Sequence, residues 1–128
     1  MQIRFCENFV GYGYEDVLFG LELKEKNVSI IHIDNPLIHI GIEENSIFLE
    51  KTRQSIHNLY NHREDINNGS TLLKQYRRIK KWHLDWTITV ADKIFGKLII
   101  KNLQGHHPNL TLFSFYKLSI IHFLHKNQ

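Results

Sequence analysis

Residues 5–20, which read FCENFVGYGYEDVLFG, combine an aromatic, glycine-rich loop with two adjacent carboxylates and the start of an apolar helix. Glycine has no Cβ, so such a loop lets the backbone approach a ligand closely. Tyrosine offers a flat apolar face with a polar tip. A carboxylate in the first turn of a helix is favoured by the helix dipole and is held on a rigid element. This stretch is therefore both the start of the first helix and the strongest candidate for a functional site.

These groups are suited to gripping a sugar and taking a proton from one of its hydroxyls. Tyr12 and Tyr14 are expected to stack on the sugar ring, with Gly13 between them. Core packing is the alternative for both tyrosines, and Tyr12 is the stronger candidate because it lies between two glycines. For Glu15 and Asp16 the alternative is a purely structural place at a helix N-terminus.

The same stretch resembles the acceptor-side motif of family 2 glycosyltransferases and the C-terminal region of related galactosyltransferases. In those enzymes an F-D-E-x-F segment runs into G-x-G-x-E-D and an apolar helix. The matching residues are Phe5, Glu7, Phe9, Gly11, Gly13, Glu15, Asp16, Phe19 and Leu23. The resemblance continues through residues 30–39 and, more weakly, 48–52. Cys6 replaces the usual Asp, and Tyr12 and Tyr14 stand where galactosyltransferases more often have Trp and Gly.

The resemblance implies a role for each site residue. Asp16 would be the general base of an inverting transfer, and Glu15 would contact the acceptor. His39 follows a predicted strand and Asp34-Asn35-Pro36, and it would complete a site for Mn²⁺ or Mg²⁺ that bridges the donor diphosphate. A structural role is the alternative for His39. The implied substrates are a nucleotide sugar and a glycan or lipid-linked acceptor in polysaccharide biosynthesis, whereas the sugar and the linkage stay open.

The resembled fold is the α/β GT-A fold of nucleotide-sugar transferases. Its N-terminal part binds the nucleotide sugar and carries an acidic D-x-D metal motif, which this sequence lacks. We therefore expect the C-terminal part of such a fold, a mostly helical α/β fragment with a helical tail. The partner would be a missing N-terminal half, as in a truncated or split gene product. Whether the fragment folds or is active alone stays open.

Hydrophobic periodicity predicts helices over residues 15–26, 45–62, 72–81 and 110–125, and the first of them is expected to be largely buried. Residues 84–103 are ambiguous, because Thr87–Val90 is strand-like within a helical spacing of apolar residues. Val28–Ile33 is β-branched and predicts a buried strand that ends before Pro36. The break at Asn67–Ser70 predicts a boundary between a motif-bearing segment, 1–66, and a basic helical tail, 67–128.

The charge is divided unequally along the 128 residues. Residues 1–63 hold 6 Lys+Arg and 9 Asp+Glu, whereas residues 64–128 hold 10 and 4, so the net charges are −3 and +6. The basic half could contact anionic lipid, nucleic acid or a nucleotide, and a solvated helix face is the alternative. One cysteine excludes an internal disulfide framework and suits a reducing compartment.

Three classes of function remain on the sequence alone. The first is the transferase segment, working in the cytoplasm and peripherally at the inner membrane face. Its basic helix, with Lys74, Arg77, Arg78 and Lys81 outermost, and residues 110–125 would make the attachment. The second is a non-catalytic carbohydrate-binding or interaction remnant without a donor site. The third is a nucleic-acid or membrane-surface module centred on residues 74–81. Nucleic acid ranks last, because aromatic residues do not interleave with this basic patch.

Overall fold

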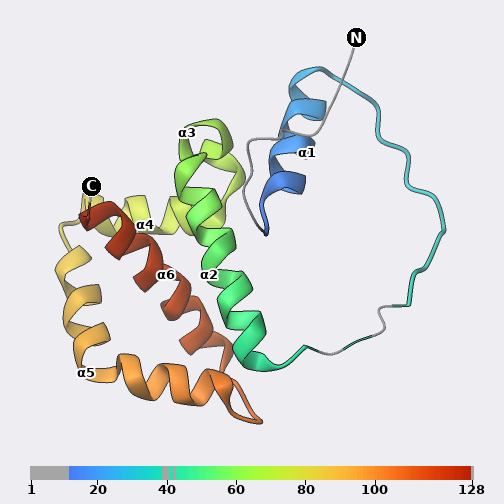
Figure 1. The fold of residues 1–128 in the computed structure, drawn as a ribbon. Coiled ribbons are helices and arrows are strands. Elements are labelled where there is room, and N and C mark those ends of the chain that lie inside the picture. Colours follow the sequence, from blue (N-terminus) through green and yellow to red (C-terminus); the bar gives the residue numbers. More distant parts are fainter. Residues whose placement is uncertain (1–11, 39–40, 42, 128) are drawn as a thin grey trace.

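The structure is a computed structural model that describes residues 12–38, 41 and 43–127. The elements in chain order are α1 (Glu15–Glu25), α2 (Asn45–Asn61), α3 (Arg63–Ile66), the 3-10 turn η1 (Asn67–Gly69), α4 (Thr71–Lys81), α5 (Asp85–Gln104) and α6 (Leu110–Lys126) (Figure 1). The expectation of a mostly helical structure is confirmed. The described residues contain no β-strand, so they do not show an α/β sheet.

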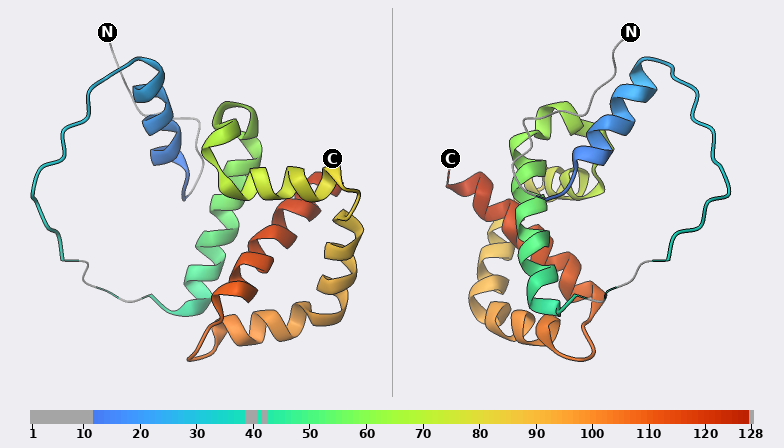
Figure 2. Two further views of the ribbon diagram at one scale, coloured as in Figure 1. Left: turned by 180° about the vertical axis from the view of Figure 1, so that it is seen from behind. Right: turned by 45° about the vertical axis from the view of Figure 1, so that its right-hand side comes forward.

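Helix α6 is the centre of the arrangement. It packs against α2, α4 and α5, and Figure 2 shows from two further sides that these three helices lie around it. The largest fully buried side chains, Ile56, Leu59, Ile66 and Ile121, come from α2, α3 and α6. Ile121 is thus a core residue of the last helix, enclosed by residues far earlier in the sequence.

One buried cluster joins both halves of the chain. It contains Leu18, Ile56 and Ile66 from the first 66 residues, and Leu73, Tyr76 and Ile121 from the rest. A second, smaller cluster is built from Leu49, Ile99 and Leu103. The division at residue 67 remains a prediction, and the turn there lies between helices that share this core.

Local capping explains where two helices begin. The Ser70 hydroxyl precedes α4 and accepts a hydrogen bond from the Leu73 backbone N–H (3.4 Å). The Asn109 side chain precedes α6 and accepts from the N–H groups of Thr111 (2.8 Å) and Leu112 (3.2 Å). Such side chains satisfy backbone donors that have no partner within the helix. The four helices predicted from periodicity are confirmed, with ends that differ by one residue.

The ambiguous region folds as one helix, α5. Ile88, Ile99 and Leu103 are buried at helical spacing, so burial of one helix face outweighs the strand propensity of Thr87–Val90. The ribbon bends near the middle of α5 (Figure 1).

The prediction of a buried strand over Val28–Ile33 is wrong. Residues 28–38 have no regular secondary structure, and Figure 1 shows them running outside the group of helices. Ile31, Ile33, Leu37 and Ile38 are each more than 75% exposed. A strand must pair its N–H and C=O groups with a neighbouring strand, and the described part of the chain supplies none.

The prediction that the first helix is largely buried is also wrong. Of the residues in α1, Leu18 alone is buried, and Val17 and Leu21 pack partly against the main cluster. Helix α1 contacts α3 and η1 rather than the central helix α6. It therefore lies at the edge of the structure, where one of its sides stays accessible.

We expect Ile121→Ala to lower the free energy of unfolding by about 2–5 kcal/mol, because it removes a fully enclosed side chain and leaves a cavity. Ile94→Ala is the matched control, since the same atoms are removed from a side chain that is 62% exposed. Urea denaturation followed by circular dichroism measures both. Equal losses for the two variants would contradict the central place of α6.

Candidate functional site

The loop before α1 is anchored on α2. The Asn58 side-chain amide donates hydrogen bonds to the carbonyl oxygens of Tyr12 (3.3 Å) and Gly13 (3.4 Å). Asn58 is itself buried within α2, so the loop rests on a rigid element. The only signal of Asn58 in the sequence is an amide near the C-terminal end of the predicted helix.

Gly13 has a position that no other residue fits. Its φ angle is 98°, a left-handed conformation that L side chains rarely adopt. A Cβ placed on Gly13 would lie 2.4 Å from the Cβ of Ser55 and 3.2 Å from its Cα. The glycine therefore lets the loop backbone lie directly against α2. The sequence suggested a close approach of this backbone to a ligand, and the structure shows a close approach to a helix.

The two tyrosines beside Gly13 have different environments. Tyr12 is 55% exposed, and the Lys51 ammonium group lies 5.4 Å from the centre of its ring, within range of a cation–π interaction. Tyr14 packs against the main cluster. Burial raises the pKa of the Tyr14 hydroxyl, with a hydrogen bond to Ser70 acting in the opposite direction and the Asp16 charge in the same one. The exposed ring of Tyr12 is open to stacking on a ligand, whereas the ring of Tyr14 is partly buried against the main cluster.

The two carboxylates differ as well. Asp16 is exposed in the first turn of α1, and its Oδ1 accepts a hydrogen bond from the Val17 N–H (2.8 Å). Glu15 is half-buried, and its Oε2 is a buried acceptor with no hydrogen-bond donor among the described residues. Neighbouring helix residues project about 100° apart, so the two groups do not face one another. Asp16 is therefore open to a substrate, whereas the Oε2 atom of Glu15 is enclosed by protein.

The predicted metal ligand, His39, lies outside the described residues. Within the residues that are described, no three side chains of His, Cys, Asp or Glu are grouped as ligands of one ion. A metal site around Glu15 and Asp16 is therefore not assembled from the described residues.

A second polar cluster lies between α4, α5 and α6. His122 is 3% exposed; its Nδ1 lies 3.4 Å from the Tyr76 hydroxyl, and its Nε2 lies 2.8 Å from Thr89 Oγ1. Tyr76, Thr89 and His122 also line a pocket of about 380 Å³. Both ring nitrogens of His122 are thus used in contacts that join three helices.

His125 extends this cluster by one turn of α6. Its Nδ1 lies 3.2 Å from the Tyr60 hydroxyl, and its Nε2 contacts the Lys80 ammonium group. Burial lowers the pKa of both histidines, and burial raises the pKa of Tyr76 to about 12. His122 and His125 are three residues apart in α6 and so lie on one face of the helix, which is consistent with a structural cluster.

No protein-family model, curated protein or solved structure matches this chain. The glycosyltransferase resemblance therefore rests on the residues that carry it, of which the structure describes those from Gly13 onward except His39. Helix α6, which the sequence suggested for interfacial attachment, carries the buried residues Ser119, Ile121 and His122. Among the helices of the described residues, none combines the length and apolar character needed to span a bilayer.

We expect Gly13→Ala to destabilise the loop and lower the free energy of unfolding by about 1–3 kcal/mol, because the residue is strained and its Cβ overlaps Ser55. Gly20→Ala is the control, since its Cβ meets no atom within 4 Å in α1. This change should stabilise the helix by roughly 0.5–1 kcal/mol. Urea denaturation measures the free energy of unfolding of both variants. A change of the same sign in the two variants would contradict the described contact between the loop and α2.

We expect the free energy of unfolding to fall as the pH drops below 6.5. The folded-state pKa of His122 lies below its ordinary value of 6.5, so the unfolded chain binds a proton at a higher pH than the folded chain does. The free energy of unfolding therefore falls as the pH is lowered from 6.5 to the folded-state pKa. His122→Gln should flatten this dependence by up to about 1.4 kcal/mol per pH unit. Denaturation between pH 8 and 5 measures the slope, and the exposed His83→Gln serves as the control.

Proposed function

We propose that this chain is the acceptor-binding and catalytic-base segment of a family 2-type glycosyltransferase, the C-terminal part of a GT-A fold. The intact enzyme moves a sugar from a nucleotide sugar to a glycan or lipid-linked acceptor. The observation that carries the proposal is the arrangement of Tyr12, Gly13 and Asp16. An exposed aromatic ring, a loop fixed against a helix and an exposed carboxylate on a first helical turn lie within five consecutive residues.

In this mechanism Asp16 is the general base. It accepts the proton of an acceptor hydroxyl while that oxygen bonds to the anomeric carbon of the donor. The bond between the anomeric carbon and the nucleoside diphosphate breaks on the opposite side, so the configuration inverts. Glu15 contacts the acceptor, as the resemblance implies, and Tyr12 stacks on the sugar ring.

The exposed segment 28–38 supports the idea of a larger enzyme. It presents five large apolar side chains to solvent, those of Ile30, Ile31, Ile33, Leu37 and Ile38. Extended, β-branched peptide of this kind adds to the edge of an existing sheet, which pairs its backbone groups and covers its side chains. We propose that the sheet belongs to the donor-binding N-terminal half of the transferase.

A divalent metal ion, Mn²⁺ or Mg²⁺, and His39 as its ligand are part of the proposal for the intact enzyme. When bound, such an ion would neutralise charge on the departing diphosphate. The roles given above to Tyr12, Glu15 and Asp16 do not depend on it, because they concern the acceptor and its proton.

The alternative is a carbohydrate-binding remnant that performs no transfer. The observation in its favour is that the loop is already anchored within this chain, through Asn58 and Ser55. Binding of an acceptor sugar would then need no donor-binding half. The two functions differ in the role of Asp16, which is essential for transfer and only one of several contacts for sugar binding.

We expect Asp16→Asn to lower kcat by a factor of about 10²–10⁴ in a transferase reconstituted with its donor-binding half, because the amide cannot accept the proton. Thermal unfolding should be unchanged, since Asp16 is exposed. Glu25→Gln removes a carboxylate from the far end of the same helix and is the control.

Undiminished transfer by Asp16→Asn would remove Asp16 from the mechanism. Sugar binding that persists in a chain with no transfer activity under any reconstitution would favour the remnant. A chain that binds neither sugar nor nucleotide sugar, even with a donor-binding half present, would contradict both functions.

A further inference from the structure

The second half of α5 exposes basic and apolar side chains next to one another. We define the α5 docking surface as Lys93, Ile94, Phe95, Lys97, Leu98 and Lys101, all of which are exposed. The three lysines recur every fourth residue and so form a row along the helix, and Ile94 and Leu98 form the adjacent row. The three apolar side chains are each more than half exposed. A surface helix normally turns such residues toward the core.

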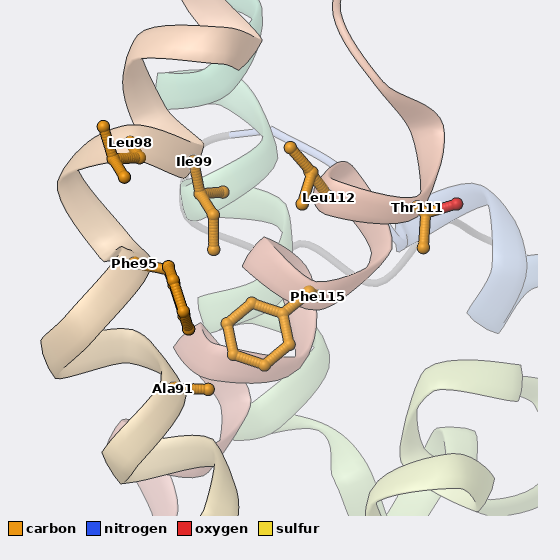
Figure 3. A pocket seen from close by; sticks show the side chains of 7 residues that line it. All are labelled: Ala91, Phe95, Leu98, Ile99, Thr111, Leu112 and Phe115. Atoms are coloured by element: carbon orange, nitrogen blue, oxygen red, sulfur yellow. The ribbon is translucent and has the colours of Figure 1, made fainter.

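The docking surface continues into an apolar groove between α5 and α6. Phe95 and Leu98 line this groove, whose volume is about 410 Å³, together with Ala91, Ile99, Thr111, Leu112 and Phe115. Figure 3 shows Phe95 from α5 and Phe115 from α6 directed toward one another across it. Among these residues, only Thr111 has a polar group in its side chain, a hydroxyl. The groove is therefore suited to an apolar occupant and offers little for a polar ligand.

The charge of this part of the chain has one sign. Residues 93–128 contain five lysines, Lys93, Lys97, Lys101, Lys117 and Lys126, and no Asp or Glu. The side-chain ion pairs found among the described residues do not include Lys93, Lys97 or Lys101. Their positive charge is thus available to an anionic partner.

We propose that the α5 docking surface binds a bilayer that contains anionic phospholipid. The ammonium groups would contact headgroup phosphates while their aliphatic stems lie along apolar surface. Ile94, Phe95 and Leu98 would enter the boundary between headgroups and acyl chains. This inference does not rest on the proposed sugar transfer, because it uses none of the residues from Tyr12 to Asp16.

A bilayer fits this surface better than a protein does. A second copy would place like-charged lysine rows opposite one another, which opposes a symmetric pair. A different protein would need carboxylates matched to the spacing of the lysines. An anionic bilayer supplies negative charge and an apolar layer together and requires no particular geometry.

Within Thr71–Lys81, the basic face of α4 has charge but no exposed large apolar side chain, although Trp82 directly after the helix is 70% exposed. Lys74, Arg78 and Lys81 are exposed there, whereas the apolar residues Leu72 and Ile79 pack partly against the main cluster. The sequence alone favoured attachment through residues 74–81 and 110–125. Because α5 exposes apolar side chains beside its lysines, we infer that α5 makes the contact with the bilayer. Helix α4 serves as the matched control.

The test measures cosedimentation of the full 128-residue chain with phosphatidylcholine vesicles, with and without phosphatidylglycerol. Binding should require phosphatidylglycerol and weaken with salt. The variant Lys93→Gln/Lys97→Gln/Lys101→Gln should partition roughly a hundredfold more weakly. The control Lys74→Gln/Arg78→Gln/Lys81→Gln removes the same charge from α4 and should change partitioning by only a few-fold.

A second variant, Ile94→Gln/Leu98→Gln, tests the apolar contact and should weaken partitioning roughly tenfold or more. Its helix content by circular dichroism should match that of the unchanged chain, because both side chains are exposed. If this variant fails to fold, the pair of charge variants still decides the question.

Three results would overturn the proposal. The first is binding that does not depend on phosphatidylglycerol, or no binding at all. The second is an equal loss in the α5 and α4 charge variants, which would mean diffuse attraction by net charge. The third is concentration-dependent self-association of the lipid-free chain that Ile94→Gln/Leu98→Gln abolishes, which would make this surface an interface between copies.

Discussion

The burial of α6 among α2, α4 and α5 is the constraint on which the rest of the structure depends. Ile121 is fully enclosed, and the adjacent His122 uses both ring nitrogens in contacts with Tyr76 and Thr89. A buried imidazole of this kind must keep its partners, because an unsatisfied polar group in the core is costly. The apolar and polar contacts of α6 therefore fix the same arrangement of helices.

The candidate site depends on this core through α2. One side of α2 buries Ile56 and Leu59 in the main cluster, while the Asn58 amide holds the loop that carries Tyr12 and Gly13. A site for acyl, phosphoryl or glycosyl transfer needs its groups held in place by a rigid neighbour. The loop has such a neighbour, and Asp16 follows on the first turn of α1.

Among the apolar side chains that the described chain leaves exposed, those of segment 28–38 and those of the α5 docking surface differ in their chemistry. Segment 28–38 is extended and rich in isoleucine without a regular row of cations, which suits the edge of a sheet. The α5 docking surface pairs its apolar side chains with a row of lysines, which suits an anionic bilayer. The two surfaces thus call for different partners, one supplying a strand and the other lipid headgroups.

The sequence by itself determined four of the helices, α1, α2, α4 and α6, because the 3.6-residue spacing of their apolar residues is a local property. It also marked residues 12–16, since glycine, tyrosine and paired carboxylates are visible without a fold. Only the tertiary structure decided that Thr87–Val90 is helical, that Tyr14 is packed while Tyr12 is exposed, and that Val28–Ile33 forms no strand. Each of these depends on whether a neighbour distant in sequence is present to cover a side chain or to pair the backbone.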